Sequence, residues 1–374
     1  MTQTRWSPDE RLLCETLVAE TPRVPPARRP GLLEAARRHR LLGLLARRVR
    51  EAGDVGPWTP AQQEGLAAAL REEVVIEALR RPELARVVAA LAADDLPAVL
   101  FKGGALAYTM YPAPHLRPRL DTDLLVREGD LPAVRRALER LGYDAAIEIT
   151  GTLVTAQCHY ARVDRYGVRH ALDVHWRPFN PARFAGLLAF DEVRASARPM
   201  PPLSPHALAP APEHQLLFAC VHRLAHHADA PDLLWLYDVH LLATSLEPGA
   251  LAAAIDLAAR KRVLALCLSS LHAARACFGT RLPEAASSSA GEQRALAERE
   301  GAAAYLDGAR PLVAQLWLDV RALDGWRARW RLVREHVLPP AAYVRARYGT
   351  ASRLALPFLY AYRVCRGAPR WFRR

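Results

Sequence analysis

Two acidic residues near the middle of the chain have the spacing needed to hold a cation. Asp121 and Asp123 come directly before a short apolar run at 124–126. In an extended strand, residues i and i+2 point to the same face, so both carboxylates would lie side by side. Such carboxylates repel each other unless a cation lies between them, and oxygen ligands suit Mg²⁺ or Mn²⁺. The pair predicts a divalent-metal site, with two solvated acids at a strand end as the plainer alternative.

A third acid, Asp173, lies farther along the chain in an alternating segment. Residues 171–176 place it on one face and apolar side chains on the other, and an acid on an inner strand needs a partner. If this strand is a neighbour of the strand at Asp121, three carboxylates converge. A two-metal centre for phosphoryl transfer needs this arrangement, because one ion orients the attacking oxygen and the other holds the triphosphate and the leaving pyrophosphate. The alternative is an ion pair with Arg169 or Arg177.

A lysine and two glycines could form the phosphate-binding part of such a site. Lys102-Gly103-Gly104 follows a short apolar run and precedes a helical stretch. Glycines at a strand-to-helix turn let backbone N–H groups approach phosphate oxygens. Only two of the 51 basic residues are lysines, so a lysine beside the glycines suggests a place where the bulkier guanidinium does not fit. Arg117 and Arg119 would add positive charge, unless they are simply solvated in a loop.

Short strands and helices alternate around these residues. Apolar runs bounded by proline and glycine indicate strands, and three–four spacing indicates helices. The order of elements predicts a small mixed sheet domain over 92–200 in an α+β protein. The patterns predict strands at 98–101, 121–126, 145–150, 153–163 and 168–176, helices at 105–110 and 131–141, and a turn at 164–167.

Helical patterns flank this sheet domain on both sides. Ser7 followed by Pro8 has the character of a helix N-cap, and apolar residues recur at helical spacing up to about residue 90. Six prolines at 199–212 predict a stiff linker. We therefore divide the chain into an N-terminal helical region at 1–91, the sheet domain at 92–200, a helical domain at 213–325 and a basic, aromatic tail at 326–374.

Composition excludes several classes of protein. Hydrophobic residues make up 51% of the 374 residues and charged residues 24%, which excludes an intrinsically disordered chain. The chain contains no run of about eighteen apolar residues, the length needed to span a membrane. The N-terminus lacks the pattern of a secretory signal. The six cysteines form no C-x-x-C pair, so a disulfide framework or zinc ribbon is not expected. We expect a cytoplasmic protein.

The positive charge is concentrated in the tail. Residues 326–374 contain twelve arginines and one acid, Glu335, and so carry about +11 of the net charge of +12. Three interpretations fit arginines that alternate with aromatic residues: a helix on an anionic membrane surface, contact with nucleic acid, or arginine stems that cover the protein's own surface. Of the two external partners the pattern favours the membrane, which would make the protein peripheral there.

Histidines gather at the start of the second helical region. His222 and His226 are four apart on an expected helix, with His227 adjacent. A second metal or a phosphate-binding patch is one interpretation. The sequence favours packed histidines that pair with nearby acids, because no third ligand stands at a suitable spacing. Trp235 and Asp238, one helix later, could border a substrate cleft or simply pack between helices.

The motifs in combination resemble a known family, the bacterial "uncharacterised nucleotidyltransferase" family of the polymerase-β-like nucleotidyltransferase superfamily. The similar segments cover roughly residues 95–365. The resemblance implies a nucleotidyltransferase fold in which the glycine turn holds phosphates, Asp121 and Asp123 bind both metal ions, and Asp173 completes one metal site near the acceptor oxygen. The similar segments are 100–106, Tyr111-Pro112, Arg117, 121–126 and 172–177, followed by 214–222, 235–239 and 338–363 in the helical region and tail.

Residues and resemblance together predict a Mg²⁺- or Mn²⁺-dependent enzyme that moves an NMP group from an NTP to a hydroxyl-bearing acceptor. Lys102, Gly103, Gly104 and Arg117 would bind the nucleotide. A sugar, an antibiotic-like small molecule, a protein side chain and RNA all fit as acceptors. One alternative is a toxin-like nucleotidyltransferase that modifies tRNA or protein. The other is a non-catalytic nucleotide-binding or scaffold protein that has kept the fold.

Overall fold

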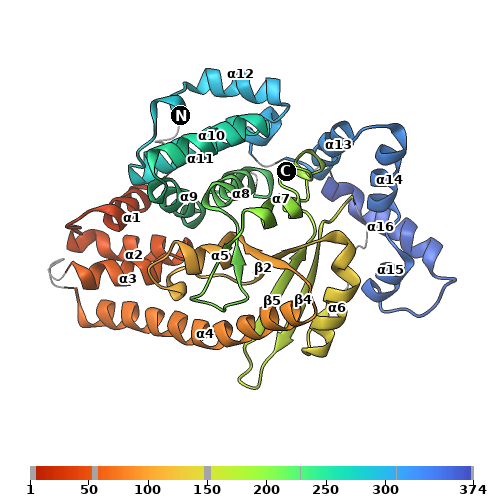
Figure 1. The fold of residues 1–374 in the computed structure, drawn as a ribbon, viewed down its shortest axis with the longest axis horizontal. Coiled ribbons are helices and arrows are strands. Elements are labelled where there is room, and N and C mark those ends of the chain that lie inside the picture. The colour runs from red at the N-terminus through yellow and green to blue at the C-terminus, as the bar shows by residue number, and fades with distance from the viewer. Residues whose placement is uncertain (1–5, 53–57, 147–152, 228, 309, 372–374) are drawn as a thin grey trace.

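A five-stranded mixed sheet lies at the centre of the protein (Figure 1). The computed structural model describes residues 6–52, 58–146, 153–227, 229–308 and 310–371. The strand order is β1-β2-β5-β4-β3; β2 and β5 are parallel, and the other neighbouring pairs are antiparallel. The strands are β1 (Ala98–Phe101), β2 (Thr122–Val126), β3 (Asp144–Ala145), β4 (Gln157–Val163) and β5 (Arg169–His175).

The two faces of the sheet pack against different helices, because successive side chains of a strand point to opposite faces. Leu100 and Leu124 belong to an apolar cluster with α4 (Pro60–Ala93) and α6 (Leu131–Arg140). Their neighbours Val99, Phe101 and Leu125 belong to a second cluster with α8 (Pro212–Ala225) and α9 (Leu233–Ser245). In Figure 1, α4 runs along the lower side of the sheet and α8 and α9 lie above it.

The remaining helices of the body surround this layered centre. Ser7 begins the first of them with a capping box, since its hydroxyl accepts the Glu10 N–H at 3.2 Å and Glu10 accepts the Ser7 N–H at 2.7 Å. The helices are α1 (Pro8–Val18), α2 (Arg29–Arg38), α3 (Leu42–Glu51), α5 (Lys102–Thr109), α7 (Phe190–Ala195), α10 (Pro248–Arg260), α11 (Leu264–Phe278) and α12 (Ala290–Glu300).

Four C-terminal helices form a lobe at one edge of the molecule (Figure 1). Glu335 fastens the lobe to the body, because its carboxylate accepts the N–H groups of Leu153 and Val154 at 3.0 and 3.3 Å. Asp319 likewise accepts the N–H of Ala182 at 2.8 Å. Among the described residues, no helix has the length and apolar character needed to cross a membrane. The lobe helices are α13 (Leu312–Ala322), α14 (Trp326–Val337), α15 (Ala341–Arg347) and α16 (Leu356–Trp371).

The predicted α+β class, with helical regions on both sides of a small mixed sheet, is confirmed. Two elements, one near the glycines and one near Asp173, begin at other residues than the sequence predicted. The helix expected from residue 105 begins at Lys102, so the diglycine lies in its first turn. The strand expected at 153–163 begins at Gln157. Most of the strand expected at 145–150 lies outside the described residues.

The segment 199–212, predicted as a stiff linker between domains, instead forms part of the core of the protein. It contains most of a short hairpin of β6 (Arg198–Pro199) and β7 (Leu208–Ala209). Met200 and Leu203 are buried in the cluster formed with α4. Its apolar side chains are buried in the core, and the free energy gained by burying them favours this packed conformation over an exposed linker.

Candidate active site

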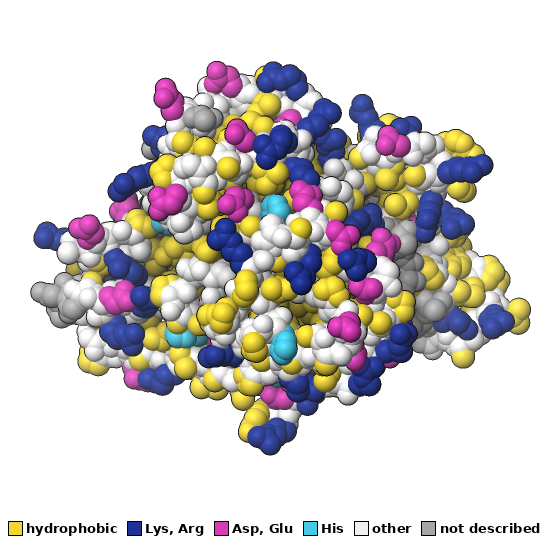
Figure 2. Space-filling model, viewed as in Figure 1, with side chains coloured by type: hydrophobic (Ala, Val, Ile, Leu, Met, Phe, Trp, Pro, Cys, Tyr) yellow, Lys and Arg dark blue, Asp and Glu magenta, His cyan; other side chains and the backbone are white. Residues whose placement is uncertain are grey.

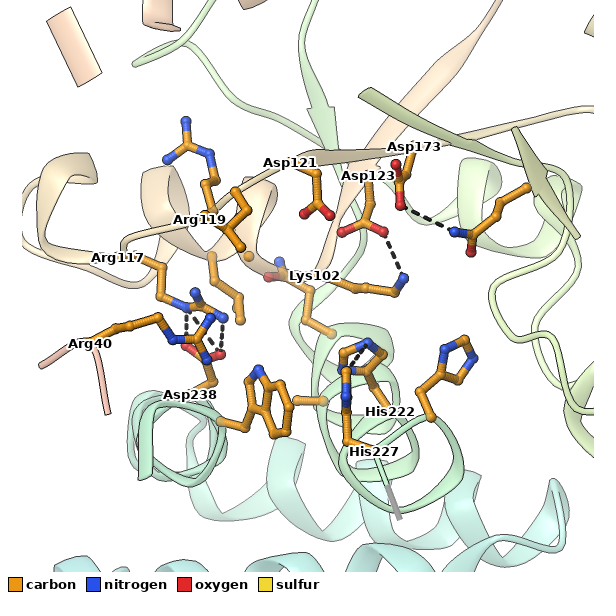
Figure 3. Close-up of a pocket in the computed structure, with 18 residues that line it drawn as sticks. Arg40, Lys102, Arg117, Arg119, Asp121, Asp123, Asp173, His222, His227 and Asp238 are labelled. Carbon is orange, nitrogen blue, oxygen red and sulfur yellow. Dashed lines mark hydrogen bonds and ion pairs between the residues drawn. The ribbon is translucent and has the colours of Figure 1, made fainter. Parts of the chain in front are cut away.

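The pairing of β2 with β5 brings two of the predicted acids together. Asp123 stands opposite Asp173 in this parallel pair, so the two strands are neighbours, which was the condition for the acids to converge. Both side chains lie on the α8 face, since Leu124 and Val174 beside them point to the α4 face. Asp121 directly precedes β2 and lines the same cavity as the other two acids. Figure 3 shows the three carboxylates next to one another.

Asp123 is held by two groups at one of its oxygens. Its Oδ1 accepts a hydrogen bond from Lys102 Nζ at 2.7 Å and lies 2.8 Å from Nε2 of the buried His175. Burial alone would raise the pKa of Asp123, but Lys102 and His175 outweigh burial and hold that pKa well below its usual value. Asp123 is therefore ionised at neutral pH. Because both contacts use Oδ1, the geometry favours Oδ2 as the oxygen for a further ligand.

Asp173 is held by two side chains from β4. Its Oδ2 accepts a hydrogen bond from Gln157 Nε2 at 3.2 Å, and Nδ1 of His159 contacts its Oδ1. Gln157 and His159 carry no recognisable signal in the sequence, because their partner depends on the register of β4 against β5. His175 could have been found, since it lies two residues after Asp173 in the same alternating strand.

Asp121 differs from Asp123 in the direction of its pKa shift. Burial, followed by the charges of Asp123 and Asp173, raises the pKa of Asp121 to about 6. The Asp121 carboxylate thus has too little positive charge near it to offset Asp123 and Asp173, and a divalent cation would supply that charge. One ligand atom each from Asp123, Asp173 and His175 lies within 4.8 Å of the others. These residues fit a shared ion, and the oxygen-rich donor set suits Mg²⁺ or Mn²⁺.

The start of α5 forms another wall of the site. Lys102 has a φ of 52°, a left-handed conformation that is uncommon for a residue with a side chain and is often found at functional sites. No side chain caps this helix, so its first N–H groups need another acceptor. Lys102 and Gly103 both line the cavity. A phosphate oxygen bound there would meet an ammonium group and the positive end of a helix.

The two glycines allow close packing around this turn. A Cβ atom on Gly104 would lie 3.1 Å from Thr122 Cγ2, so a side chain there would press against β2. A Cβ on Gly103 would lie 3.3 Å from the guanidinium group of Arg117. Glycine at 104 lets α5 approach the strand that carries Asp123, and glycine at 103 lets Arg117 lie against the turn.

Arg117 and Arg119 are buried and paired, so the alternative of two solvated loop arginines is wrong. Arg117 binds Asp238 of α9 at both carboxylate oxygens, at 2.8 and 2.7 Å, which is the strong two-point geometry of arginine. Arg119 binds Glu77 of α4 at 3.0 Å. Both arginines still line the cavity, and Figure 3 shows Arg117 and Asp238 on the side opposite Asp173.

Three histidines in and directly after the last turn of α8 face the acids across this cavity, whose volume is about 330 Å³. The ring of His227 stacks on Trp235 at 3.8 Å, and Nε2 of His222 lies 3.3 Å from Nε2 of His227. Burial, followed by the charge of Lys102, lowers the pKa of all three histidines, and that of His227 falls to about 4. They are therefore neutral at neutral pH. Trp235 and Asp238 line the cavity. This agrees with the first of the two interpretations given for them, that they border a cleft.

The packed interpretation of the histidines fits better than a second metal site. Within the described residues, the group spaced to hold a metal is Asp123, Asp173 and His175. The Nε2 atom of His226 instead accepts the N–H of Asn180 at 3.2 Å. These histidines contact one another, Trp235, the backbone of Asn180 and the ring of Phe179.

Comparison with known protein families identifies the family to which the chain is similar. A family model described as "Uncharacterised nucleotidyltransferase" matches residues 25–279. No curated protein matches the chain. The matched segment contains all three acids, the diglycine turn and the helices that surround them. It begins earlier than the expected segment of 95–365 and ends before the C-terminal lobe.

Proposed function

We propose that this chain, which belongs to the uncharacterised nucleotidyltransferase family, transfers an NMP group from an NTP to a hydroxyl-bearing acceptor and releases pyrophosphate. The observation that carries the proposal is the convergence of Asp121, Asp123 and Asp173 on a cavity that Lys102 and Gly103 also line. A metal-bound triphosphate needs both features, because carboxylates hold the metal and cationic or N–H groups hold the phosphates.

The acids would hold a pair of divalent ions, Mg²⁺ or Mn²⁺, as in a two-metal centre. In this proposal Asp121 and Asp123 bind both ions and Asp173 completes one of the sites. Bound ions would neutralise phosphate charge and orient the attacking hydroxyl. Lys102 and His175 support this role because they fix the Asp123 carboxylate before any ligand arrives. Groups that orient metal-binding side chains in this way raise affinity and rate.

The triphosphate would lie at the start of α5. Lys102 offers an ammonium group, and the N–H groups of Gly103 and Gly104 belong to a helix start without a side-chain cap. Arg117 packs against the turn, because its guanidinium group lies next to Gly103 and is held in place by Asp238. We propose that Arg117 binds the nucleotide mainly by holding this turn in place and by adding positive potential.

The acceptor would enter from the side of Asp173. A second cavity of about 350 Å³ shares His226 with the first. Its wall includes Asn180, whose Nδ2 lies 3.5 Å from Oε1 of Gln157, the residue that binds Asp173. Polar groups of Gln315 and Asp319 also line it, which suits a molecule with several hydroxyls. The Asp173 carboxylate would position the reacting hydroxyl and accept its proton.

The decisive experiment measures pyrophosphate release and label transfer from each α-labelled NTP, with Mg²⁺ and cell extract, in wild type and in Asp123→Asn. Asparagine keeps the shape but removes the charge, so we expect at least about a thousandfold loss of transfer, equal to several kcal/mol of transition-state stabilisation. Asp256→Asn on the exposed side of α10 is the matched control and should behave as wild type. Full activity in Asp123→Asn, with an unchanged circular dichroism spectrum, would contradict the proposal.

The same assay separates the two alternatives. A toxin-like enzyme would label tRNA or protein in the extract and arrest growth on expression, and Asp121→Asn would relieve the arrest. A non-catalytic protein would bind NTP without releasing pyrophosphate, and its binding would survive Asp173→Asn.

A further inference from the structure

Large hydrophobic side chains are exposed on the C-terminal lobe to an unusual degree. Of the fifteen exposed large hydrophobic residues in the described chain, nine lie between Leu312 and Val364. Soluble proteins seldom gather so many on one region unless it contacts a partner. We call these nine residues the lobe surface: Leu312, Trp317, Trp326, Trp330, Leu338, Leu354, Phe358, Tyr362 and Val364.

Helical spacing aligns part of the lobe surface into stripes. Trp326 and Trp330 are one turn apart on α14, with 71% and 63% of their surface exposed, and together with Arg329 and Val333 they line an open apolar groove. Such i, i+4 neighbours lie on the same side of a helix. On α16, Phe358 and Tyr362 repeat this spacing. Both helices thus present an apolar, aromatic side away from the core.

The charge around these stripes is almost entirely positive. Residues 326–374 contain twelve arginines, and their one acid is Glu335. Glu335 is buried, pairs with Arg331 at 3.0 Å and accepts the N–H groups of Leu153 and Val154. Among the described residues after Trp326 the lobe surface therefore offers cations and no exposed carboxylate, and the nearest exposed acid of the lobe is Asp324, just before α14. Figure 2 shows Lys and Arg side chains beside hydrophobic ones on the projecting lobe.

We propose that the lobe surface binds the headgroup region of an anionic lipid bilayer, without crossing it. Exposed tryptophans between arginines are typical of helices that lie in a membrane interface, where the rings enter the headgroup layer and the cations meet anionic lipids. The charge argues against a second copy of this chain, since the same face of two copies would bring arginines against arginines. Exposed aliphatic residues such as Leu354 and Val364 argue against nucleic acid, whose bases stack on aromatic rings.

The test is co-sedimentation of the full chain with vesicles of phosphatidylcholine alone and of phosphatidylcholine mixed with phosphatidylglycerol. We expect binding to the mixed vesicles, weaker binding at high salt, and little binding to phosphatidylcholine alone. The double variant Trp326→Ser with Trp330→Ser should bind at least about tenfold more weakly, because it removes two interfacial rings. Its matched control is Val163→Ser with Tyr166→Ser, which changes side chains of similar exposure, 63% and 61%, at the β4–β5 turn and should bind normally.

The other occupants give distinguishable results. Absence of binding to the mixed vesicles, or equal binding by both double variants, would overturn the proposal. So would a dimer in analytical ultracentrifugation that depends on Trp326 and Trp330, or tight binding to duplex DNA or RNA without vesicle binding. All of these measurements omit NTP, so their outcome is independent of the transfer reaction. Unchanged circular dichroism spectra of both variants would show that folding is intact.

Discussion

At the scale of single residues, Asp121 and Asp123 show how two identical groups acquire different properties two positions apart. Lys102 and His175 hold the pKa of Asp123 below its usual value, whereas burial and the neighbouring acids raise the pKa of Asp121 to about 6. Protons therefore compete with a metal ion at Asp121 rather than at Asp123, because a carboxylate must be ionised to bind a cation.

This difference predicts a pH dependence of metal binding. Below pH 6 the metal-free protein takes up a proton at Asp121, so the apparent affinity for Mn²⁺ should fall by up to about tenfold per pH unit. Titration calorimetry with Mn²⁺ above and below pH 6 measures the effect. Asp121→Asn should bind Mn²⁺ more weakly and lose most of the dependence. An affinity that stays constant through pH 6 in wild type would count against Asp121 as a ligand.

The histidines opposite the acids predict a pH dependence of stability. The pKa of His227 falls from 6.5 to about 4 on folding, through burial and the charge of Lys102. Between these values the unfolded chain binds a proton that the folded protein does not, so His227 makes stability rise with pH there and fall as pH drops below 6.5. Asp121 acts in the opposite direction between its usual value of 3.8 and about 6, so the contribution of His227 is isolated only by comparing variants.

Urea unfolding at several pH values in His227→Gln tests this contribution. The variant should lose less stability than wild type on acidification below pH 6.5, because one unfavourable protonation is gone. His206→Gln is the control, since His206 is exposed and its replacement should leave the slope unchanged. An identical slope in wild type and His227→Gln would show that the histidine is protonated equally in both states.

At the scale of elements, the close approach of α5 to β2 determines where Lys102 can reach. A Cβ atom added at position 104 would lie 3.1 Å from Thr122 Cγ2. Gly104→Ala should therefore destabilise the protein by about 1–3 kcal/mol through overpacking. The better helix propensity of alanine offsets up to about 1 kcal/mol of this cost. Thr122→Ser removes the clashing methyl group, so Gly104→Ala should cost clearly less in that background.

Urea denaturation of the four proteins in this double-mutant cycle gives the coupling between positions 104 and 122. Gly129→Ala serves as the control for a glycine with open space around it, and it should leave stability nearly unchanged. Equal costs of Gly104→Ala with threonine and with serine at position 122 would show that the contact does not limit the packing of α5.

Sequence patterns predict the elements better than their partners, and the site shows why. Proline, glycine and two-residue alternation mark β1, β2 and β5, because these signals are local. The partner of Arg117 is Asp238, 121 residues away, and this pair depends on where α9 lies relative to the loop that follows α5. The contact of His159 with Asp173 depends on the β4–β5 register. Such contacts follow from tertiary packing, which no local pattern records.

At the scale of the whole molecule, the sheet shares its core with helices from both ends of the chain. Val99, Phe101 and Leu125 belong to one buried cluster with residues from Trp6 to Tyr305, and the ring of Phe101 lies 5.4 Å from that of Phe218 in α8. The other face of the sheet is covered by α4. The segment 92–200 contains only the last two residues of α4 and none of α8, although it has the length of a domain.

We therefore predict that residues 92–200 alone do not fold cooperatively. Full burial of Val99, Phe101 and Leu125 is worth about 1.5–3 kcal/mol each, and together this matches a large part of the roughly 5–15 kcal/mol that stabilises an ordinary domain. Urea unfolding followed by circular dichroism should show no sigmoidal transition for 92–200, and a sigmoidal one for residues 6–308, which retain the whole cluster. A cooperative transition in 92–200 would mean that the sheet is stable without α4 and α8, and that the sheet domain alone could place Asp121, Asp123 and Asp173.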